Sequence, residues 1–573
     1  MKLFYTATLF ILLNVCAFNQ VSAQSASYIQ SLQAQNHWVD SVFNTLNMRC
    51  KIAQLFFIRA HTNRGQAYAD SVAQVIKKQQ PGGLVFFQGG PVRQVNLSNQ
   101  YQKLAKIPLL IAMDGEWGLG MRLDSTISYP YQMALGAVQD NTLLNQMGQQ
   151  VAYDFKRIGM HLNFAPVMDI NNNPDNPVIN YRSFGDNKYN VAQKAIAYMQ
   201  GMQQGGLLTT AKHFPGHGDT NVDSHMDLPL LNFTRQRLDT LEEYPFKEAI
   251  AAGISGIMVA HMSIPVLDNT QHLPSTLSRP IITNLLKDEL GFKGLVVSDA
   301  MEMKGVVKYF PGGEADVKAF IAGNDILELS ENSARAIKKI KQAIHSGQVT
   351  EQELDAKVKK VLAAKYWAGL NQYQPSNPIG TVADLNRQQA KALVQQLSNA
   401  AVTLLQGDSV IQQLDFGQNT ALVSIGTEGP SVYQYELGKV FTNARMFNVG
   451  KSASAAEISQ LLAMLHGYPQ IVIGIHDSRL RPASKLDFSA SVKQLIAQLA
   501  GNKGSVISVF ANPYTLANLP GIEKAGAILE CYQKDESMQR AAVKVLTRQL
   551  IPQGKLPVRI NAFWANGTGL VLP

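Results

Sequence analysis

The sequence predicts two α/β domains, namely a (β/α)₈ TIM barrel followed by a smaller α/β (αβα) sandwich domain. Three observations support this prediction. The chain has 573 residues, which is too long for one ordinary hydrophobic core. Short apolar runs alternate with amphipathic segments over the first part of the chain, a pattern typical of a parallel sheet covered on both faces. Eight such units in about 280 residues indicate a closed barrel.

The eight expected barrel strands are short apolar runs at 53–58, 82–87, 108–113, 161–167, 207–211, 256–260, 294–298 and 325–329. Amphipathic segments of helical periodicity separate several of them, such as 190–204 and 279–290. Two further helices over 334–370 are expected to close this domain.

A second α/β unit follows a polar linker. The predicted organisation is a signal peptide at 1–23, the barrel at 24–370, the linker at 371–395 and the sandwich domain at 396–573. The strands expected in the sandwich domain lie at 401–406, 421–426, 471–476, 505–511 and 526–532. No GxGxxG or P-loop motif occurs there, so we expect no nucleotide site in this domain.

The N-terminus has the features of a secretory signal. Lys2 precedes a short apolar run, and Val-Ser-Ala stands before Gln24, which predicts cleavage after Ala23. A lipid anchor on Cys16 is the alternative, which the large preceding residue Val15 disfavours. No later segment offers 18 consecutive apolar residues, so no integral membrane segment is expected. We therefore expect an exported protein, periplasmic or extracellular.

Composition excludes several classes of function. The formal net charge is +9, from 51 basic and 42 acidic residues, but no Lys/Arg run of nucleic-acid-binding type occurs. We expect a mildly basic surface and no nucleic-acid partner, with attraction to acidic polymers left open. After signal cleavage only Cys50 and Cys531 remain, which makes neither a disulfide framework nor a cysteine metal site.

Polar and charged side chains follow most of the expected barrel strands directly. The active sites of such barrels lie at the C-terminal ends of the strands. The third to seventh strands are followed by Asp114, the segment 169–177, Lys212 with His213, His261 and Asp299. The sequence therefore predicts an active site at this end of the barrel.

The segment 211–225 is the densest of these, with three histidines, two aspartates and a lysine. One interpretation is a metal centre built from His213, His217, Asp219, Asp223 and His225. The spacing is irregular, no HExxH motif is present, and glycines interrupt the run, so we predict neither a metal site nor a cofactor. His217 and Asp219 are interpreted as residues that shape the loop.

The end of this segment favours proton transfer. In an extended chain, Asp223 and His225 share a side, so the carboxylate can orient the imidazole and stabilise its protonated form. Such a histidine serves as a general acid and then as a base. Asp299, directly after an apolar strand, is a plausible nucleophile for a sugar anomeric carbon; its alternative role is to cap the following helix.

Taken in order, the motifs DGE, YRSFGD, KHFPGHGDT, DSH, LVVSDAMEM and AGND resemble glycoside hydrolase family 3, and within it the NagZ-type β-N-acetylglucosaminidases. The resemblance spans roughly residues 50–330 and is most specific in KHFPGHGDT–DSH. The tail IPQGKLPVRI resembles the end of the family's second domain, so the resemblance extends more thinly to the sandwich domain.

The resemblance implies a retaining exo-acting β-N-acetylglucosaminidase that releases terminal GlcNAc from cell-wall-type or other β-GlcNAc glycans through a covalent glycosyl-enzyme. It assigns the nucleophile to Asp299, the acid/base to His225 and its partner to Asp223. It assigns substrate binding to Asp114, Arg182, Lys212 and His213. The family's Gly-Gly-Arg after the DGE motif is absent, and Arg122 is the candidate replacement. Whether His261 lines the pocket is left open.

Two alternatives remain within the enzyme class. A neutral imidazole would not repel phosphate, so the chain could be a β-N-acetylglucosaminide phosphorylase; it could also be another family 3 β-glycosidase, such as a β-glucosidase. A catalytically inactive sugar-binding protein is the alternative from a different class. The oligomeric state, the natural leaving group and the task of the second domain are not predicted. Without ligand, we expect high mobility around residues 217–225.

Overall fold

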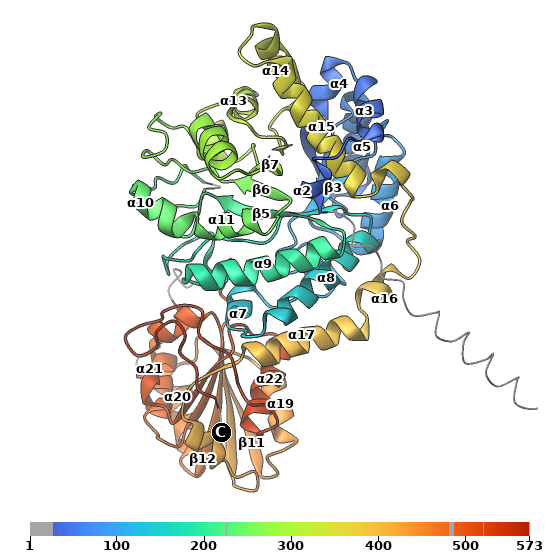
Figure 1. Ribbon diagram of the computed structural model, residues 1–573. Coiled ribbons are helices and arrows are strands. Elements are labelled where there is room, and N and C mark those ends of the chain that lie inside the picture. The colour runs from blue at the N-terminus through green and yellow to red at the C-terminus, as the bar shows by residue number, and fades with distance from the viewer. Residues whose placement is uncertain (1–26, 225, 481–485, 520, 572–573) are drawn as a thin grey trace, which may run out of the picture.

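A computed structural model describes residues 27–224, 226–480, 486–519 and 521–571, and it confirms the predicted fold class. The chain forms a barrel domain and a separate sheet domain, with helix α17 (Gln388–Ala401) along their junction (Figure 1). The predicted signal segment, the candidate anchor Cys16 and His225 lie outside the described residues.

The barrel sheet contains eight strands among the described residues, in the order β7-β6-β5-β4-β3-β2-β1-β8, and every paired neighbour is parallel. A parallel bridge between Val297 and Ile326 brings β7 next to β8 and closes the ring. The strands are β1 (Phe56–Ala60), β2 (Gly83–Phe86), β3 (Leu110–Met113), β4 (Leu162–Asn163), β5 (Leu208–Phe214), β6 (Gly256–Val259), β7 (Leu295–Ser298) and β8 (Leu327–Glu328).

All residues of β2, β3, β6 and β7 are buried, because the barrel interior covers one face of each strand and helices cover the other. This double burial is why these strands are continuous apolar runs in the sequence. Strand β1 begins three residues later than expected. The expected start belongs to helix α4 (Met48–Ala53), which Asn47 caps by accepting a hydrogen bond from the Cys50 N–H.

Helices surround the barrel (Figure 1). Helices α8 (Asn141–Arg157) and α9 (Lys188–Gln204) approach closely because glycines face each other at their contact: a Cβ on Gly201 would lie 2.0 Å from the carbonyl oxygen of Asn145. Apart from three short 3₁₀ helices, η1 (Leu119–Met121), η2 (Asn180–Arg182) and η4 (Ser275–Leu277), the helices described after strands β1 to β7 are α5 (Gly65–Gln79), α6 (Pro91–Gln102), α7 (Gln132–Gly136), α8, α9, α10 (Arg235–Arg237), η3 (Leu238–Glu242), α11 (Tyr244–Ala251), η5 (Pro280–Glu289), α12 (Lys304–Val307) and α13 (Glu314–Ala322). Helices α2 (Tyr28–Ser31), α3 (His37–Asn44), α14 (Ser333–His345) and α15 (Glu351–Trp367) complete the domain.

The second domain contains a six-stranded sheet in the described part of the chain, in the order β11-β10-β12-β13-β14-β9. Five of its strands match the sequence prediction: β9 (Thr403–Gln406), β10 (Thr420–Ile425), β12 (Gln470–His476), β13 (Val506–Phe510) and β14 (Ala527–Glu530). Strand β11 (Ala444–Val449) was not predicted. It lies at the edge of the sheet and only Phe447 and Val449 are buried, so it lacks a continuous apolar run.

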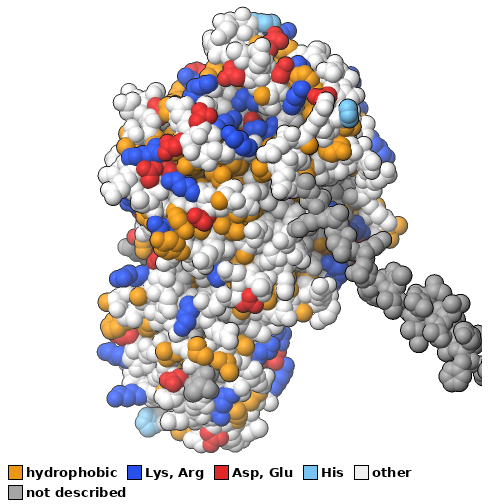
Figure 2. Space-filling model, viewed as in Figure 1, with side chains coloured by type: hydrophobic (Ala, Val, Ile, Leu, Met, Phe, Trp, Pro, Cys, Tyr) orange, Lys and Arg blue, Asp and Glu red, His pale blue; other side chains and the backbone are white. Residues whose placement is uncertain are grey.

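Helices cover this sheet on both faces: α18 (Asp408–Gln412), α19 (Val432–Gly438), α20 (Ala455–Leu465), α21 (Ala490–Ala500) and α22 (Glu536–Leu546). Helix α16 (Thr381–Leu385) and the start of α17 occupy part of the segment expected to be a linker. On the face shown in Figure 2, basic and acidic side chains are interspersed over both domains. None of the described helices combines the length and apolar character needed to cross a membrane.

Candidate active site

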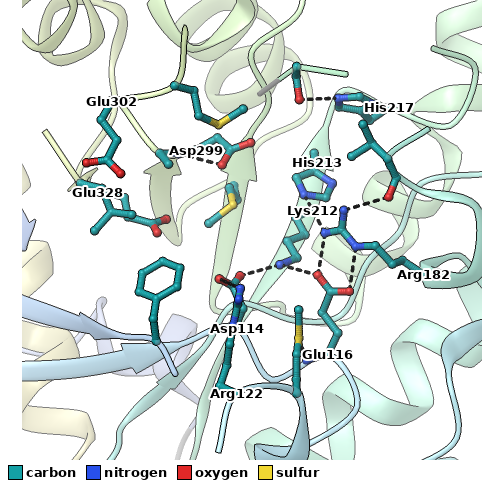
Figure 3. A pocket seen from close by; sticks show the side chains of 18 of the residues that line it. Asp114, Glu116, Arg122, Arg182, Lys212, His213, His217, Asp299, Glu302 and Glu328 are labelled. Atoms are coloured by element: carbon teal, nitrogen blue, oxygen red, sulfur yellow. Dashed lines mark hydrogen bonds and ion pairs between the residues drawn. The ribbon is translucent and has the colours of Figure 1, made fainter. Parts of the chain in front are cut away.

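A pocket of about 480 Å³ opens at the C-terminal ends of the barrel strands (Figure 3). The residues that line it come from segments far apart in the sequence, because each of the eight barrel strands, or the loop that follows it, contributes at least one. It contains five of the seven predicted site residues: Asp114, Arg182, Lys212, His213 and Asp299. The geometry therefore brings these residues together, while their roles in catalysis stay predictions.

Lys212 is the buried cation of the pocket. It follows the apolar part of β5, and its ammonium lies 2.8 Å from an oxygen of Asp114 and 2.8 Å from an oxygen of Glu116. Burial favours the neutral amine, but the two carboxylates outweigh burial and raise the pKa of Lys212 above its ordinary value. Lys212 therefore stays charged and can donate a hydrogen bond to a ligand hydroxyl.

Asp114 is held between two cations. Besides Lys212, it pairs with Arg122, whose guanidinium lies 2.8 Å from the second carboxylate oxygen. Burial opposes ionisation of Asp114, but Lys212 and Arg122 outweigh it and hold its pKa below the ordinary value. Arg122 itself lines the pocket and packs over the ring of Phe87, while its role as a replacement for the missing family arginine stays a prediction.

Glu116 is a pocket residue that sequence reasoning missed, although it stands in the same DGE motif as Asp114. Arg182 binds both of its oxygens, at 2.9 and 2.6 Å. Burial would raise the pKa of Glu116, but Arg182 and Lys212 hold it well below its ordinary value. In turn, Glu116 raises the pKa of Arg182, whose own burial acts in the opposite direction. Glu116 thereby fixes the position of both cations.

His213 is oriented by Asp169, a second residue that the sequence prediction missed. The His213 Nδ1 lies 2.7 Å from one Asp169 oxygen, and the backbone N–H groups of His213 and His217 donate to the other. With Nδ1 as the donor, Nε2 is left to face the pocket, where it lies 3.4 Å from Arg182. The sequence feature that could have identified Asp169 is its position just after the fourth predicted barrel strand.

His217 lines the pocket, and Asp219 pairs with helix α10; their interpretation as loop-shaping residues stays a prediction. The ring nitrogens of His217 lie 2.9 Å from the Thr220 hydroxyl and 3.1 Å from the Ser224 hydroxyl. Burial, with the nearby His213, lowers the pKa of His217 to about 4. Asp219 forms a 2.6 Å ion pair with Arg237.

Asp299, the predicted nucleophile, follows β7 and faces the cavity (Figure 3). One of its carboxylate oxygens accepts a 2.7 Å hydrogen bond from the Ala300 N–H, which orients the side chain. His261, whose place was left open, does not line the pocket. Its ring lies behind Ala300, with Nε2 3.0 Å from the Ala300 carbonyl oxygen and Nδ1 2.6 Å from the Thr276 hydroxyl.

Of the predicted acid/base pair, the structure describes only Asp223. Asp223 is half-buried, and its carbonyl oxygen accepts from the N–H groups of Met226 and Asp227. Its partner His225 lies outside the described residues. Ser224, between the two, is buried and lines the pocket, so this segment reaches the cavity that contains Asp299.

Glu328 is a further carboxyl group that the sequence did not single out, because it stands inside the apolar run of β8. It is 3% exposed, and its Oε2 has no hydrogen-bond partner among the described residues. Burial, with the charges of Asp114 and Asp299, raises its pKa well above the ordinary value. In Figure 3, Glu328 lies across the cavity from Lys212. The pocket thus holds a carboxyl group whose surroundings favour its protonated form and which faces the charged network.

Comparison with known proteins identifies the family. The profile of the glycosyl hydrolase family 3 N-terminal domain matches residues 47–364, which is more than half of the chain. The chain belongs to glycosyl hydrolase family 3. It is therefore a glycoside hydrolase, and its TIM barrel is the domain that the family profile describes.

Similar proteins extend over both domains of this family 3 chain. Beta-hexosaminidase A of Pseudoalteromonas piscicida is 27% identical over 547 residues, covering 86% of this chain and 91% of that protein. The solved structure of a family 3 β-N-acetylglucosaminidase from Paenibacillus sp. str. FPU-7 is 29% identical, with a TM-score of 0.73, and covers 90% of this chain and 99% of that one. A β-N-acetylglucosaminidase/β-glucosidase of Cellulomonas fimi is 26% identical over 376 residues, 64% of this chain and 66% of that protein.

The pocket chemistry suits a neutral, polyhydroxylated ligand in this family 3 barrel. Ionised carboxylates accept hydrogen bonds from hydroxyls, while Lys212 and Arg122 donate them, so one sugar ring can satisfy both kinds of group. Among the described residues, no three His, Cys, Asp or Glu side chains converge to hold a metal ion.

Proposed function

We propose that this family 3 enzyme is a retaining exo-acting β-N-acetylglucosaminidase that releases terminal GlcNAc from β-GlcNAc glycans. The observation that carries the proposal is the placement of Asp299 in the same pocket as the Asp114–Lys212–Glu116 network. The network holds the hydroxyls of a terminal sugar, and Asp299 faces the anomeric carbon. Relatives that are named β-hexosaminidase or β-N-acetylglucosaminidase support GlcNAc as that sugar.

The proposed reaction has two steps. Asp299 attacks the anomeric carbon and forms a glycosyl ester, while His225 transfers its proton to the departing oxygen. His225, now neutral, then takes a proton from water, whose oxygen attacks the anomeric carbon and releases Asp299 as a carboxylate. Asp223 orients the imidazole and stabilises its charged form in the first step.

Activity on two aryl glycosides tests the proposal. The wild type is expected to hydrolyse 4-nitrophenyl β-GlcNAc faster than 4-nitrophenyl β-glucoside, and Asp299→Asn is expected to lose activity on both. Mass spectrometry after reaction with a slowly hydrolysed 5-fluoro glycosyl fluoride should find the sugar on the peptide that contains Asp299. A wild type that is as inactive as Asp299→Asn, yet binds GlcNAc, would instead indicate a sugar-binding protein.

Two alternatives within the enzyme class have their own support. The Cellulomonas fimi relative is named for both β-N-acetylglucosaminidase and β-glucosidase activity, so a preference for the glucoside would move the chain to that substrate class. A neutral histidine base would admit phosphate as the acceptor. The formation of GlcNAc 1-phosphate in phosphate buffer would identify a phosphorylase, and GlcNAc alone would identify a hydrolase.

We further propose an exported enzyme that acts on cell-wall-derived muropeptides. The N-terminal sequence has the pattern of a secretory signal, and the motif resemblance favours peptidoglycan fragments over chitin oligosaccharides. Fractionation of cells that express the full chain would place the enzyme in the periplasm or medium. Product analysis with muropeptides and chitobiose side by side would identify the preferred leaving group.

A further inference from the structure

We propose that the second domain positions the active-site loop 217–224 through Asn512 and Tyr514, which act on the loop by way of an asparagine-rich segment of the barrel. This asparagine segment, residues 171–180, contains five asparagines in ten residues and follows β4. The inference rests on the proposed function in one respect, since the loop leads to the predicted acid/base pair.

The first link joins the two domains. The Asn512 side-chain amide donates a 2.7 Å hydrogen bond to the amide oxygen of Asn180, and the Asn171 amide donates at 3.0 Å to the hydroxyl of Tyr514. All four side chains are buried. Asn512 is held in this orientation because its own oxygen accepts from the Tyr514 N–H at the start of helix η7 (Pro513–Asn518).

The second link connects the two ends of the asparagine segment. The backbone N–H of Asn180 donates at 3.0 Å to the Asn171 side-chain oxygen, so the two residues that meet the second domain also bind each other. Between them, the Asn176 oxygen accepts from the N–H groups of Val178 and Ile179, and the Asn180 amide donates to the Pro174 carbonyl. The segment is therefore internally braced by its own asparagines.

The third link runs from the segment to the active-site loop. The Asn176 amide donates at 2.9 Å to the His217 carbonyl oxygen, and the Asn173 amide donates at 3.2 Å to the Thr220 carbonyl oxygen. At Gly218 the loop presses so closely on the barrel that a Cβ would lie 1.7 Å from the Ile170 carbonyl oxygen. The loop backbone is therefore fixed where it meets the asparagine segment.

The fourth link reaches the pocket. The ring of His217 lies 3.1 Å from the hydroxyl of Ser224, and Ser224 lines the cavity that contains Asp299. Hydrogen bonds, together with the short stretches of chain between them, thus connect Asn512 and Tyr514 to the pocket rim. Most of these groups are buried. Removing the side-chain amide of Asn512 or the hydroxyl of Tyr514 therefore leaves a buried polar group of the asparagine segment unpaired, and the segment is expected to shift to find another partner.

A simpler explanation is that these contacts only hold the domains together. Asn566 provides a matched control, because its amide binds Asp186 of the barrel across the same junction but touches neither the asparagine segment nor the loop. Asn566→Ala removes an inter-domain hydrogen bond without removing a link of the series. Tyr514→Phe removes only the hydroxyl that accepts from Asn171, and Asn512→Ala removes the donor to Asn180.

The test compares leaving groups. The 2,4-dinitrophenolate leaving group departs with little protonation, whereas 4-methoxyphenolate must be protonated by the general acid. A misplaced general acid therefore lowers kcat/KM only for the 4-methoxyphenyl substrate. For Tyr514→Phe combined with Asn512→Ala, kcat/KM on the 4-methoxyphenyl β-GlcNAc is expected to fall roughly tenfold or more, within the range by which a general acid contributes. On the dinitrophenyl substrate it should stay within about twofold, and Asn566→Ala should change neither. Equal losses on both substrates, or no loss on either, would refute the positioning role.

Amide hydrogen exchange separates this inference from the proposed function. The double variant is expected to exchange the amides of 217–224 faster than the wild type and Asn566→Ala, while the core strands of both domains exchange at unchanged rates. Unchanged exchange in the loop would overturn the inference whatever the enzyme cleaves. A wild type inactive on both aryl β-GlcNAc substrates would overturn the proposed function, with the exchange result still deciding whether the second domain positions the loop.

Discussion

The buried ammonium of Lys212 lies 2.8 Å from Asp114 and equally close to Glu116, so one cation bridges two carboxylates in the pocket. Lys212 is almost fully buried and Glu116 is completely buried. If the ammonium or one of the carboxylates is removed, the charge that remains is buried with fewer partners and little water. The loss in folding free energy is then far larger than the contribution of an exposed ion pair. The network therefore serves both sugar binding and the stability of the barrel.

Lys212→Met is expected to destabilise the protein by about 3–5 kcal/mol, because it removes the cation that two buried carboxylates share and leaves each with a single arginine. Urea unfolding followed by circular dichroism measures the change. Lys308→Met is the matched control: its ion pair with Asp227 is exposed and is expected to contribute no more than about 1 kcal/mol. If the two variants lost equal stability, the buried network would not be a stabilising unit.

Glu328→Gln is expected to retain most activity at neutral pH, since Gln keeps the shape and a hydrogen-bond donor in place of the protonated acid. Glu328→Leu removes the donor and should lower kcat/KM by roughly ten- to a hundredfold if Glu328 contacts the sugar. The measurement is hydrolysis of an aryl β-GlcNAc. A Leu variant as active as the Gln variant would show that the donor makes no contact with substrate.

Stability against pH tests the protonation of Glu328 separately. Its pKa in the folded state is raised well above the ordinary 4.5, so the unfolded state loses its proton first as the pH rises. The stability that the protonated group contributes is present below pH 4.5 and is lost progressively above it. The free energy of unfolding of Glu328→Gln relative to wild type should therefore increase as the pH rises from 4.5 to 8. A constant difference would mean that Glu328 is ionised in the fold.

Incubation with EDTA is expected to leave activity unchanged, because the proposed chemistry uses Asp299 and His225 and no metal. The addition of zinc to the same samples should not raise their activity. Loss of activity on chelation, with recovery by zinc, would support the alternative interpretation of the histidine-rich segment 211–225.

The sequence was sufficient to place the pocket residues that directly follow apolar strands. Asp114, Lys212 and Asp299 each stand at the point where a buried run ends, and the closure of parallel strands into a barrel brings such positions to one end. The barrel itself was predictable for the same reason, since strands buried on both faces are continuous apolar runs. The pattern of apolar residues and the positions of the polar residues that follow them therefore predict the barrel and part of its site without any knowledge of tertiary contacts.

The residues that were missed depend on pairing across the fold. Glu116 acquires its role from Arg182, which is 66 positions away, and Asp169 acquires its role from His213, 44 positions away. Glu328 lies within an apolar strand, where a carboxyl group has no local signature of a pocket residue. Strand β11 was missed for a related reason, because an edge strand with alternating exposure has no continuous apolar run.

The acid stability of the loop provides the last prediction. Burial lowers the pKa of His217 from 6.5 to about 4, so in this range the unfolded state binds a proton that the folded state does not. The stability contributed by neutral His217 is fully present above pH 6.5 and is lost as the pH falls towards 4. The wild type should therefore lose more stability between pH 7 and pH 4 than His217→Gln, whose amide does not titrate, as measured by urea unfolding at each pH. Equal losses would mean that His217 binds a proton as readily in the folded protein as in the unfolded chain, and that its contacts with Thr220 and Ser224 do not depend on the neutral ring.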